Sequence, residues 1–180
     1  MAASGRELLE QARAGDLDAF AEFVRAFERR IRGVCFRLLD DARDVDEAVQ
    51  DTFVQAWRNL ERFRGDASPY TWLYRIAVNE ALMRRRRKTL PTSELRETTV
   101  AAGEDAFAAA DVRAFLVERL RALPIEYRAA VVLRDVEGLS NEEVADALEI
   151  SLAAAKSRIH RGRMHLREEL ERWERAQEGR

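Results

Sequence analysis

Two serine N-caps, Ser140 and Ser151, bound the stretch that most restricts how this chain can fold. Ser140 is followed by Glu143 at the spacing of a capping box, ahead of the apolar residues of a first helix. Ser151 caps a second helix that is basic and carries no acid until Glu168. Two capped helices joined by a short turn favour a helix-turn-helix whose second helix enters the DNA major groove. A generic helical hairpin with a solvated basic face is the alternative.

The second helix separates a buried face from a basic one. Its apolar and small residues keep one-face spacing and are expected in a core: Ala155, Ile159, Gly162, Leu166 and Leu170. Its other sides show Lys156, Ser157, Arg158, His160, Arg161 and Arg163. The small side chain of Ala145 lets the two helices cross closely. No Cys, Asp or Glu stands at ligand spacing from His160 or His165, so we expect no metal site here.

A second informative stretch, Arg62–Lys88, combines aromatic rings with cations. Ser68 is the expected N-cap and Pro69 the first residue of a helix that runs to about Lys88. Helical periodicity places Arg75, Asn79 and Arg86 close together on one face. Cations for phosphates, rings that stack on bases and an amide that reads a base edge are typical of a surface for single-stranded nucleic acid. The alternative is a core helix with buried aromatics and a solvated arginine tail.

The residues before this stretch predict a helical bundle. A short helix is expected over residues 6–13, and Asp16 or Asp18 caps a long one that ends at about Leu38. A third helix is expected over residues 45–61, with Trp57 on its inner side. Its outer face is either an ordinary solvated surface or a docking surface for a basic helical partner. That face carries Asp44, Glu47, Gln50, Asp51 and Gln55.

An acidic, weakly periodic segment divides the chain. Residues 89–111 read as a flexible linker between a first domain at 1–88 and a second at 112–180, where helical spacing resumes. Within the second domain Pro124 starts a helix that ends at Gly138. The expected fold class is therefore all-α, with an N-terminal helical bundle and a C-terminal helix-turn-helix.

Composition narrows the function. The formal net charge is only −2 although basic residues cluster, so a nucleic-acid binder of this kind would bind weakly alone and need a partner. The one cysteine, Cys35, lies in an apolar pattern and is expected to be a buried hydrophobe. No signal region or membrane span is visible, so we expect a cytoplasmic protein without membrane insertion. A phosphate-binding glycine loop, a metal set and a nucleophile–base arrangement are not seen, so we expect no enzyme activity, cofactor or metal.

Three stretches together resemble bacterial RNA polymerase sigma factors of the extracytoplasmic-function (ECF) group. They are DARDVDEAVQDTFVQAW, RFRGDASPYTWLYRIAVN and LPIEYRAAVVLRDVEGLSNEEVADALEISLAAAKSRIHRGRMHL. The resemblance implies sigma region 2 at residues 1–88 and sigma region 4 at 112–180. It also implies a protein that binds core RNA polymerase and directs promoter recognition, DNA melting and transcription initiation.

The resemblance assigns partners to both domains. The helix at 44–60 would dock on the β′ clamp helices of core polymerase through Asp44, Glu47, Gln50, Asp51 and Gln55, and the β subunit would also be contacted. The minus-ten promoter element would be opened and read, with a base flipped into the loop at 64–68. The residues implied are Phe63, Arg64, Gly65, Asp66, Ser68, Tyr70, Trp72, Arg75, Asn79 and Arg86.

The helix-turn-helix would read the minus-thirty-five element as duplex DNA. The residues implied are Ser151, Ala154, Lys156, Ser157, Arg158 and Arg161. The family usually has Gly in the turn, where this chain has Glu149, so the turn is expected to find another backbone solution. Ala154 and Ala155 replace a usual Thr-Val pair, so weaker contacts to this element are expected. An anti-sigma factor is an implied partner.

Two other functions remain open at this point. A stand-alone helix-turn-helix regulator would explain residues 112–170 but leave the N-terminal bundle without a role. A helical adaptor that binds only protein is the second. The promoter sequence and the inducing signal cannot be read from the chain.

Overall fold

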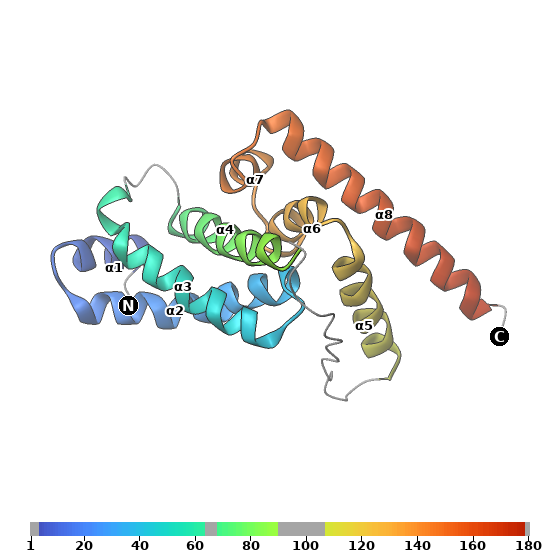
Figure 1. Cartoon of the computed structure of the whole chain (residues 1–180), viewed down its shortest axis with the longest axis horizontal. Coiled ribbons are helices and arrows are strands. Elements are labelled where there is room, and N and C mark those ends of the chain that lie inside the picture. Colours follow the sequence, from blue (N-terminus) through green and yellow to red (C-terminus); the bar gives the residue numbers. More distant parts are fainter. Residues whose placement is uncertain (1–3, 64–67, 90–106, 179–180) are drawn as a thin grey trace.

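The computed structural model describes residues 4–63, 68–89 and 107–178, which form helices and no strand (Figure 1). The N-terminal half contains α1 (Gly5–Arg13), α2 (Leu17–Leu38), α3 (Ala42–Arg58), the short 3₁₀ helix η1 (Leu60–Arg62) and α4 (Pro69–Thr89). The C-terminal half contains α5 (Phe107–Ala122), α6 (Ile125–Val131), the π-helical turn η2 (Val132–Val136), α7 (Asn141–Ala147) and α8 (Leu152–Glu178). None of the described helices is long and apolar enough to cross a bilayer.

Side-chain caps fix the starts of the N-terminal helices. Ser4 and Glu7 form a capping box on α1. The Asp16 carboxylate accepts from the backbone N–H groups at the start of α2, and Asp41 does the same for α3. Of the two caps considered for α2, Asp16 is therefore the one used.

The N-terminal core lies between α2, α3 and α4. The largest fully buried side chains of α2 are Phe23, Ile31, Val34 and Leu38. From α4 come Leu73, Val78 and two alanines, Ala77 and Ala81, all at 0% exposure. Cys35 is buried as expected, and burial raises its pKa to about 12.

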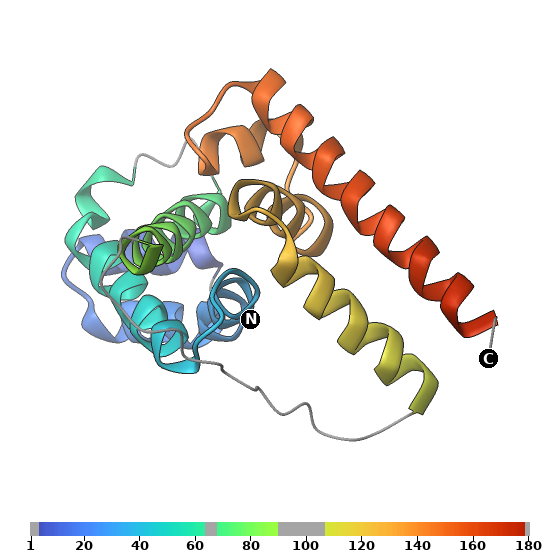
Figure 2. The same ribbon diagram turned by 45° about the vertical axis from the view of Figure 1, so that its right-hand side comes forward.

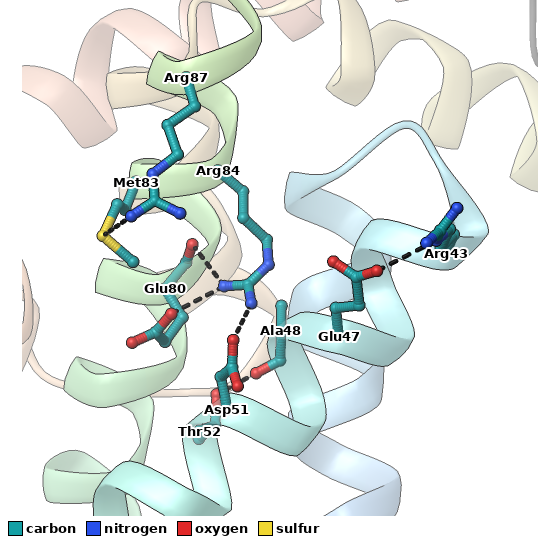
Figure 3. Close-up of polar contacts among 9 residues, drawn as sticks. All are labelled: Arg43, Glu47, Ala48, Asp51, Thr52, Glu80, Met83, Arg84 and Arg87. Carbon is teal, nitrogen blue, oxygen red and sulfur yellow. Dashed lines mark hydrogen bonds and ion pairs between the residues drawn. The ribbon is translucent and has the colours of Figure 1, made fainter.

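An ionic seam joins α4 to α3, and we define it by Arg84, Glu80 and Asp51 (Figure 3). The Arg84 guanidinium is only 12% exposed; it donates to the Glu80 carboxylate at 2.7 Å and to that of Asp51. Burial opposes the charge of Arg84, but its hydrogen bonds to Glu80 and Asp51 raise its pKa above the ordinary value.

Most of the cationic run at 84–88 therefore forms ion pairs with acids of the same domain. Arg85 pairs with Asp40 at 2.5 Å, and Lys88 pairs with Asp41 at 3.5 Å and with Asp44. The solvated arginine tail considered as the alternative does not describe these residues, because the acids around the start of α3 lie opposite the last turns of α4.

In the C-terminal half, α8 packs closely on α6 where Gly162 lies. A Cβ atom at Gly162 would fall 2.5 Å from Cγ2 of Val131 and 3.3 Å from the carbonyl oxygen of Tyr127. Farther along α8, Trp173 stacks on Phe115 of α5 with ring centroids 5.2 Å apart.

The two halves contact each other, with α4 beside α7 and α2 beside α6 (Figure 2). Arg128 of α6 is 0% exposed and donates to the Leu38 carbonyl and to Asp40, both at 3.3 Å. Burial lowers the pKa of Arg128 to about 10. Arg121 of α5 donates to the Phe36 carbonyl at 3.3 Å and lies over its ring at 4.5 Å.

The structure differs from the sequence prediction at two helix starts. α5 begins at Phe107, inside the segment assigned to the linker, and its first turn contains Ala108, Ala109 and Ala110, which have the highest helix propensity. α3 begins at Ala42 instead of at residue 45, because Asp41 caps it. The helix after Pro124 passes through the π-helical turn before Gly138, which has φ +77°.

We expect Gly162→Ala to lower the free energy of unfolding by about 1–3 kcal/mol, because the added methyl group overlaps Val131 in a packed interface. Gly33→Ala in α2 is the matched control. There the new methyl meets only the movable end of Arg37, so helix propensity should raise stability by up to about 1 kcal/mol. Urea unfolding of both variants measures this, and a stabilising Gly162→Ala would contradict the close packing.

We expect Glu80→Gln to lower the free energy of unfolding by roughly 1–3 kcal/mol, because Arg84 loses a charged acceptor in a largely buried seam. The control Glu47→Gln removes an i,i+4 pair with Arg43, whose side chain is 86% exposed, and should cost at most ~0.5 kcal/mol. Equal losses in thermal or urea unfolding would show that the seam is no stronger than a surface pair.

Candidate nucleic-acid and protein interfaces

Three of the residues assigned to the minus-ten element, Arg75, Asn79 and Arg86, lie on one exposed strip of α4. Tyr70 is also exposed, but on a different side of the helix. Ser68 fixes the start of this helix, since its hydroxyl accepts from the backbone N–H of Thr71 at 3.1 Å. The predicted cap is therefore present, and Tyr70 lies in the first turn after it. Arg64, Gly65 and Asp66 lie outside the described residues, as does most of the loop expected to hold a flipped base.

The aromatic residues of this region divide between surface and core. Tyr70 is 38% exposed; it packs on Phe27 with centroids 4.4 Å apart and lies under the guanidinium of Arg30 at 4.8 Å. Trp72 is half-buried against Phe63, with centroids 5.2 Å apart. Phe63 itself is 4% exposed, so in this conformation it supports Trp72 and offers no ring face to a base.

Three glutamates of the C-terminal half contact the same helix. The Thr71 hydroxyl donates to Glu143 at 2.8 Å, and the Tyr74 hydroxyl donates to Glu137 at 2.6 Å. The Arg75 guanidinium donates to Glu149 at 2.6 and 3.0 Å. These contacts join residues far apart in sequence, so periodicity and capping signals gave no indication of them.

The first two contacts shift the pKa values of their partners. The Ser140 backbone N–H and the Thr71 hydroxyl both donate to the Glu143 carboxylate and lower its pKa. Burial, followed by the hydrogen bond to Glu137, raises the pKa of Tyr74. Glu143 therefore stays ionised while it caps α7 and accepts from α4.

The helix-turn-helix has the predicted caps. Ser140 and Glu143 form the capping box of α7, and the Ser151 hydroxyl accepts from the Ala154 backbone N–H at 3.2 Å. The turn was predicted wrongly: Glu149 itself adopts the left-handed conformation, with φ +53°. No alternative backbone solution is used, although glycine adopts this region with less strain.

The candidate residues for the minus-thirty-five element lie along the start of α8. Ser151, Lys156, Ser157 and Arg161 are exposed, whereas Ala154 and Arg158 are half-buried. The Arg161 guanidinium donates to the Tyr127 hydroxyl at 3.2 Å, and this hydrogen bond raises the pKa of Arg161. Ala155 and Ile159 are buried, so the predicted separation of core and basic faces is present.

The expected docking face of α3 divides in two. Asp44 and Asp51 pair with Lys88 and Arg84 of α4, so their charges are partly neutralised within the fold. Glu47 pairs with the neighbouring Arg43, and Gln55 contacts Asn59. Of the five residues, Gln50 also lines the apolar groove described next.

A groove of about 590 Å³ lies between α2 and α3. Its apolar wall includes Leu17, Val54 and Trp57, which are 67%, 38% and 40% exposed. Trp57 was expected on the inner side of α3, but it lies at the groove and contacts the ring of Phe20, with centroids 4.9 Å apart. Charged rim residues are Glu28, Arg32 and Asp46. The spacing of Gln50, Phe53, Val54 and Trp57 along one helical face is the signal that could have revealed the groove.

Within the described part of the chain, no cluster of three or more His, Cys, Asp or Glu residues could hold a metal ion. The arrangement thus offers two basic surfaces suited to nucleic acid and one apolar groove suited to a protein helix.

Two family models match the chain. The one described as Sigma-70 region 2 matches residues 23–90, and the one described as Sigma-70, region 4 matches residues 116–166. The first match covers most of α2 and all of α3 and α4. The second runs from α5 into α8 and includes the helix-turn-helix.

Two solved structures have a similar fold. CnrH in complex with the cytosolic domain of CnrY has a TM-score of 0.70 at 29% identity, covering 93% of this chain and 97% of that one. The sigma factor RpoE in complex with the anti-sigma factor NepR from Bartonella quintana has a TM-score of 0.72 at 25% identity, covering 86% and 98%.

Curated relatives are similar over nearly the whole chain. RNA polymerase sigma-H factor of Pseudomonas aeruginosa is 33% identical over 172 residues, or 88% of this chain and 89% of the relative. ECF RNA polymerase sigma factor SigW of Bacillus subtilis is 32% identical over 179 residues, or 92% of this chain and 96% of the relative. With both conserved regions present in order, the chain belongs to the extracytoplasmic-function group of RNA polymerase sigma factors.

Proposed function

We propose that this chain binds core RNA polymerase in the cytoplasm and directs it to promoters that it recognises at two separate elements. The observation that carries the proposal is the presence of two different candidate DNA surfaces, on α4 and on α8, in one chain of the sigma-factor family. Residues 1–88 act as region 2, residues 89–111 as the linker and residues 112–180 as region 4. The role consists of binding, and bond chemistry stays with the polymerase.

Docking on the polymerase uses the α2–α3 groove together with the exposed side of α3. The groove is apolar with a charged rim, which suits the apolar face of an amphipathic helix such as a β′ clamp helix. Because Asp44 and Asp51 already have cationic partners, Gln50 and Trp57 are proposed to contribute more to this contact than the acids do. The β subunit is a further proposed contact of the chain.

The minus-ten element is bound along α4. Tyr70 and Trp72 retain exposed ring surface for stacking, Asn79 offers an amide for a base edge, and Arg86 is exposed near the end of the helix. Stacking of this kind is worth about 1–3 kcal/mol per base, which offsets unstacking costs of a few kcal/mol per step. Arg75 joins this surface once it is released from Glu149.

The minus-thirty-five element is bound by α8 in the major groove. Lys156 and Arg161 supply phosphate or base contacts, and Ser151 and Ser157 supply hydroxyl groups near the start of the helix. Ala154 presents only a methyl group there. An anti-sigma factor is a further proposed partner, since similar folds occur in complexes such as that of RpoE with NepR.

Transcription by core polymerase reconstituted with the full chain tests the proposal. We expect RNA starts that core enzyme alone does not make, mapped by sequencing the 5′ ends of transcripts from a genomic template. A stand-alone helix-turn-helix regulator would bind duplex DNA without core enzyme and create no new starts. A protein-only adaptor would bind core enzyme and add no salt-dependent DNA affinity, and either result would overturn the proposal.

We expect Trp57→Ala to weaken binding to core polymerase by about 30-fold, because truncating an aromatic anchor in a groove commonly costs about 2 kcal/mol. Met164→Ala is the matched control, since Met164 is exposed to a similar extent, 41%, and lies on α8. Affinity is measured by fluorescence anisotropy, with circular dichroism as the check on folding. Unchanged affinity of a folded Trp57→Ala variant would exclude the groove as the docking site.

A further inference from the structure

We propose that Glu137, Glu143 and Glu149 form a clasp that holds the C-terminal half against α4 in the free chain and covers part of its candidate DNA surface. The inference deepens the proposed function and rests on it for the identity of what is covered. The physical closure of the clasp can be measured without polymerase or promoter.

The clasp joins one face of α4 to three separate segments. Thr71, Tyr74 and Arg75 follow the i, i+3, i+4 spacing of neighbours on a helix surface. Their acceptors come from the residue after η2, from the first turn of α7 and from the turn before α8. The three contacts measure 2.6–2.8 Å at their shortest, and α4 lies beside α7 in both overall views (Figures 1 and 2).

The backbone at Glu149 supplies a second observation. A φ of +53° at a non-glycine residue stores strain that glycine would avoid. What glutamate adds over glycine is its side chain, and that side chain ends in the carboxylate bound to Arg75. We attribute the choice of residue in this strained turn to the contact between the two halves.

The spacing of promoter elements requires the clasp to open. Elements centred near minus ten and minus thirty-five are about 25 base pairs apart, or roughly 85 Å along B-DNA at 3.4 Å per base pair. Arg75 cannot remain 2.6 Å from Glu149 while the two halves sit on separate elements. The closed arrangement therefore belongs to the chain away from its promoter, and opening frees the Arg75 guanidinium.

The clasp is weak because the side chains of its one ion pair are exposed to solvent. The side chains of Arg75 and Glu149 are 50% and 55% exposed, so solvent screens the pair. Arg128 and Arg121 make further contacts between the halves. Loss of the Arg75–Glu149 pair should therefore shift the ratio of closed to open molecules by about two- to five-fold and leave the rest of the interface in place.

Energy transfer between dyes on Arg58→Cys and Asp146→Cys of the full chain reports closure, since Cys35 is buried. We expect Arg75→Glu and Glu149→Arg each to reduce the closed-to-open ratio about two- to five-fold, and the double swap to restore it. Glu142→Arg, an equal charge change at an exposed residue of α7, should leave the ratio unchanged. No change in either single variant, or no recovery in the double swap, would overturn the clasp.

To test whether the clasp covers the DNA surface, the affinity of the free chain for labelled oligo(dT) is measured, with no dye on the protein. We expect Glu149→Gln to bind the oligonucleotide about two- to five-fold more tightly than Glu142→Gln, although both variants lose the same charge. Equal affinities would show that only net charge matters and would overturn the covering. If closure responds to the charge swaps while the reconstituted polymerase makes no new starts, the clasp stands and the proposed function fails.

Discussion

The close packing of α4 against α2 and α3 is the constraint on which the other features depend. Ala77 and Ala81 have no exposed surface and bring the helix backbones near each other, and the Arg84–Glu80–Asp51 seam fixes the end of the helix. With these faces occupied, α4 has one remaining strip. That strip carries the candidate DNA residues Arg75, Asn79 and Arg86, and the C-terminal half contacts it through the Arg75–Glu149 pair.

Charge is arranged so that basic groups are balanced inside the molecule. The formal net charge is −2, and the cations of α4 are paired with acids around α3 or with the glutamates of the C-terminal half. Nucleic-acid affinity depends on the phosphates that free cations neutralise, so such pairing lowers the affinity of the isolated chain. A specificity subunit of this kind has little tendency to occupy DNA without the enzyme it serves.

Local signals in the sequence predicted much of the fold and part of the site. The serine caps could be predicted because each hydroxyl accepts from a backbone N–H only three residues later, so the signal is local in the sequence. These caps are Ser68, Ser140 and Ser151. The burial of Phe63 and the exposure of Trp57 depend on how the helices pack against one another, and the periodicity of a single helix does not predict that. The clasp joins Thr71 to Glu143 across the whole linker, so periodicity could not indicate it. Glu149 was misread because a departure from glycine was taken to change the backbone, whereas the backbone is unchanged and strained.

The distance between the two halves, measured in the free and promoter-bound states, shows whether the halves separate on DNA. Dyes on α3 and α7 would be compared in the free chain, in the complex with core polymerase, and after a promoter identified by its transcripts is added. We expect high energy transfer in the free chain and low transfer on the promoter, because the two elements lie roughly 85 Å apart. Equal transfer in the free chain and in an actively transcribing promoter complex would contradict it.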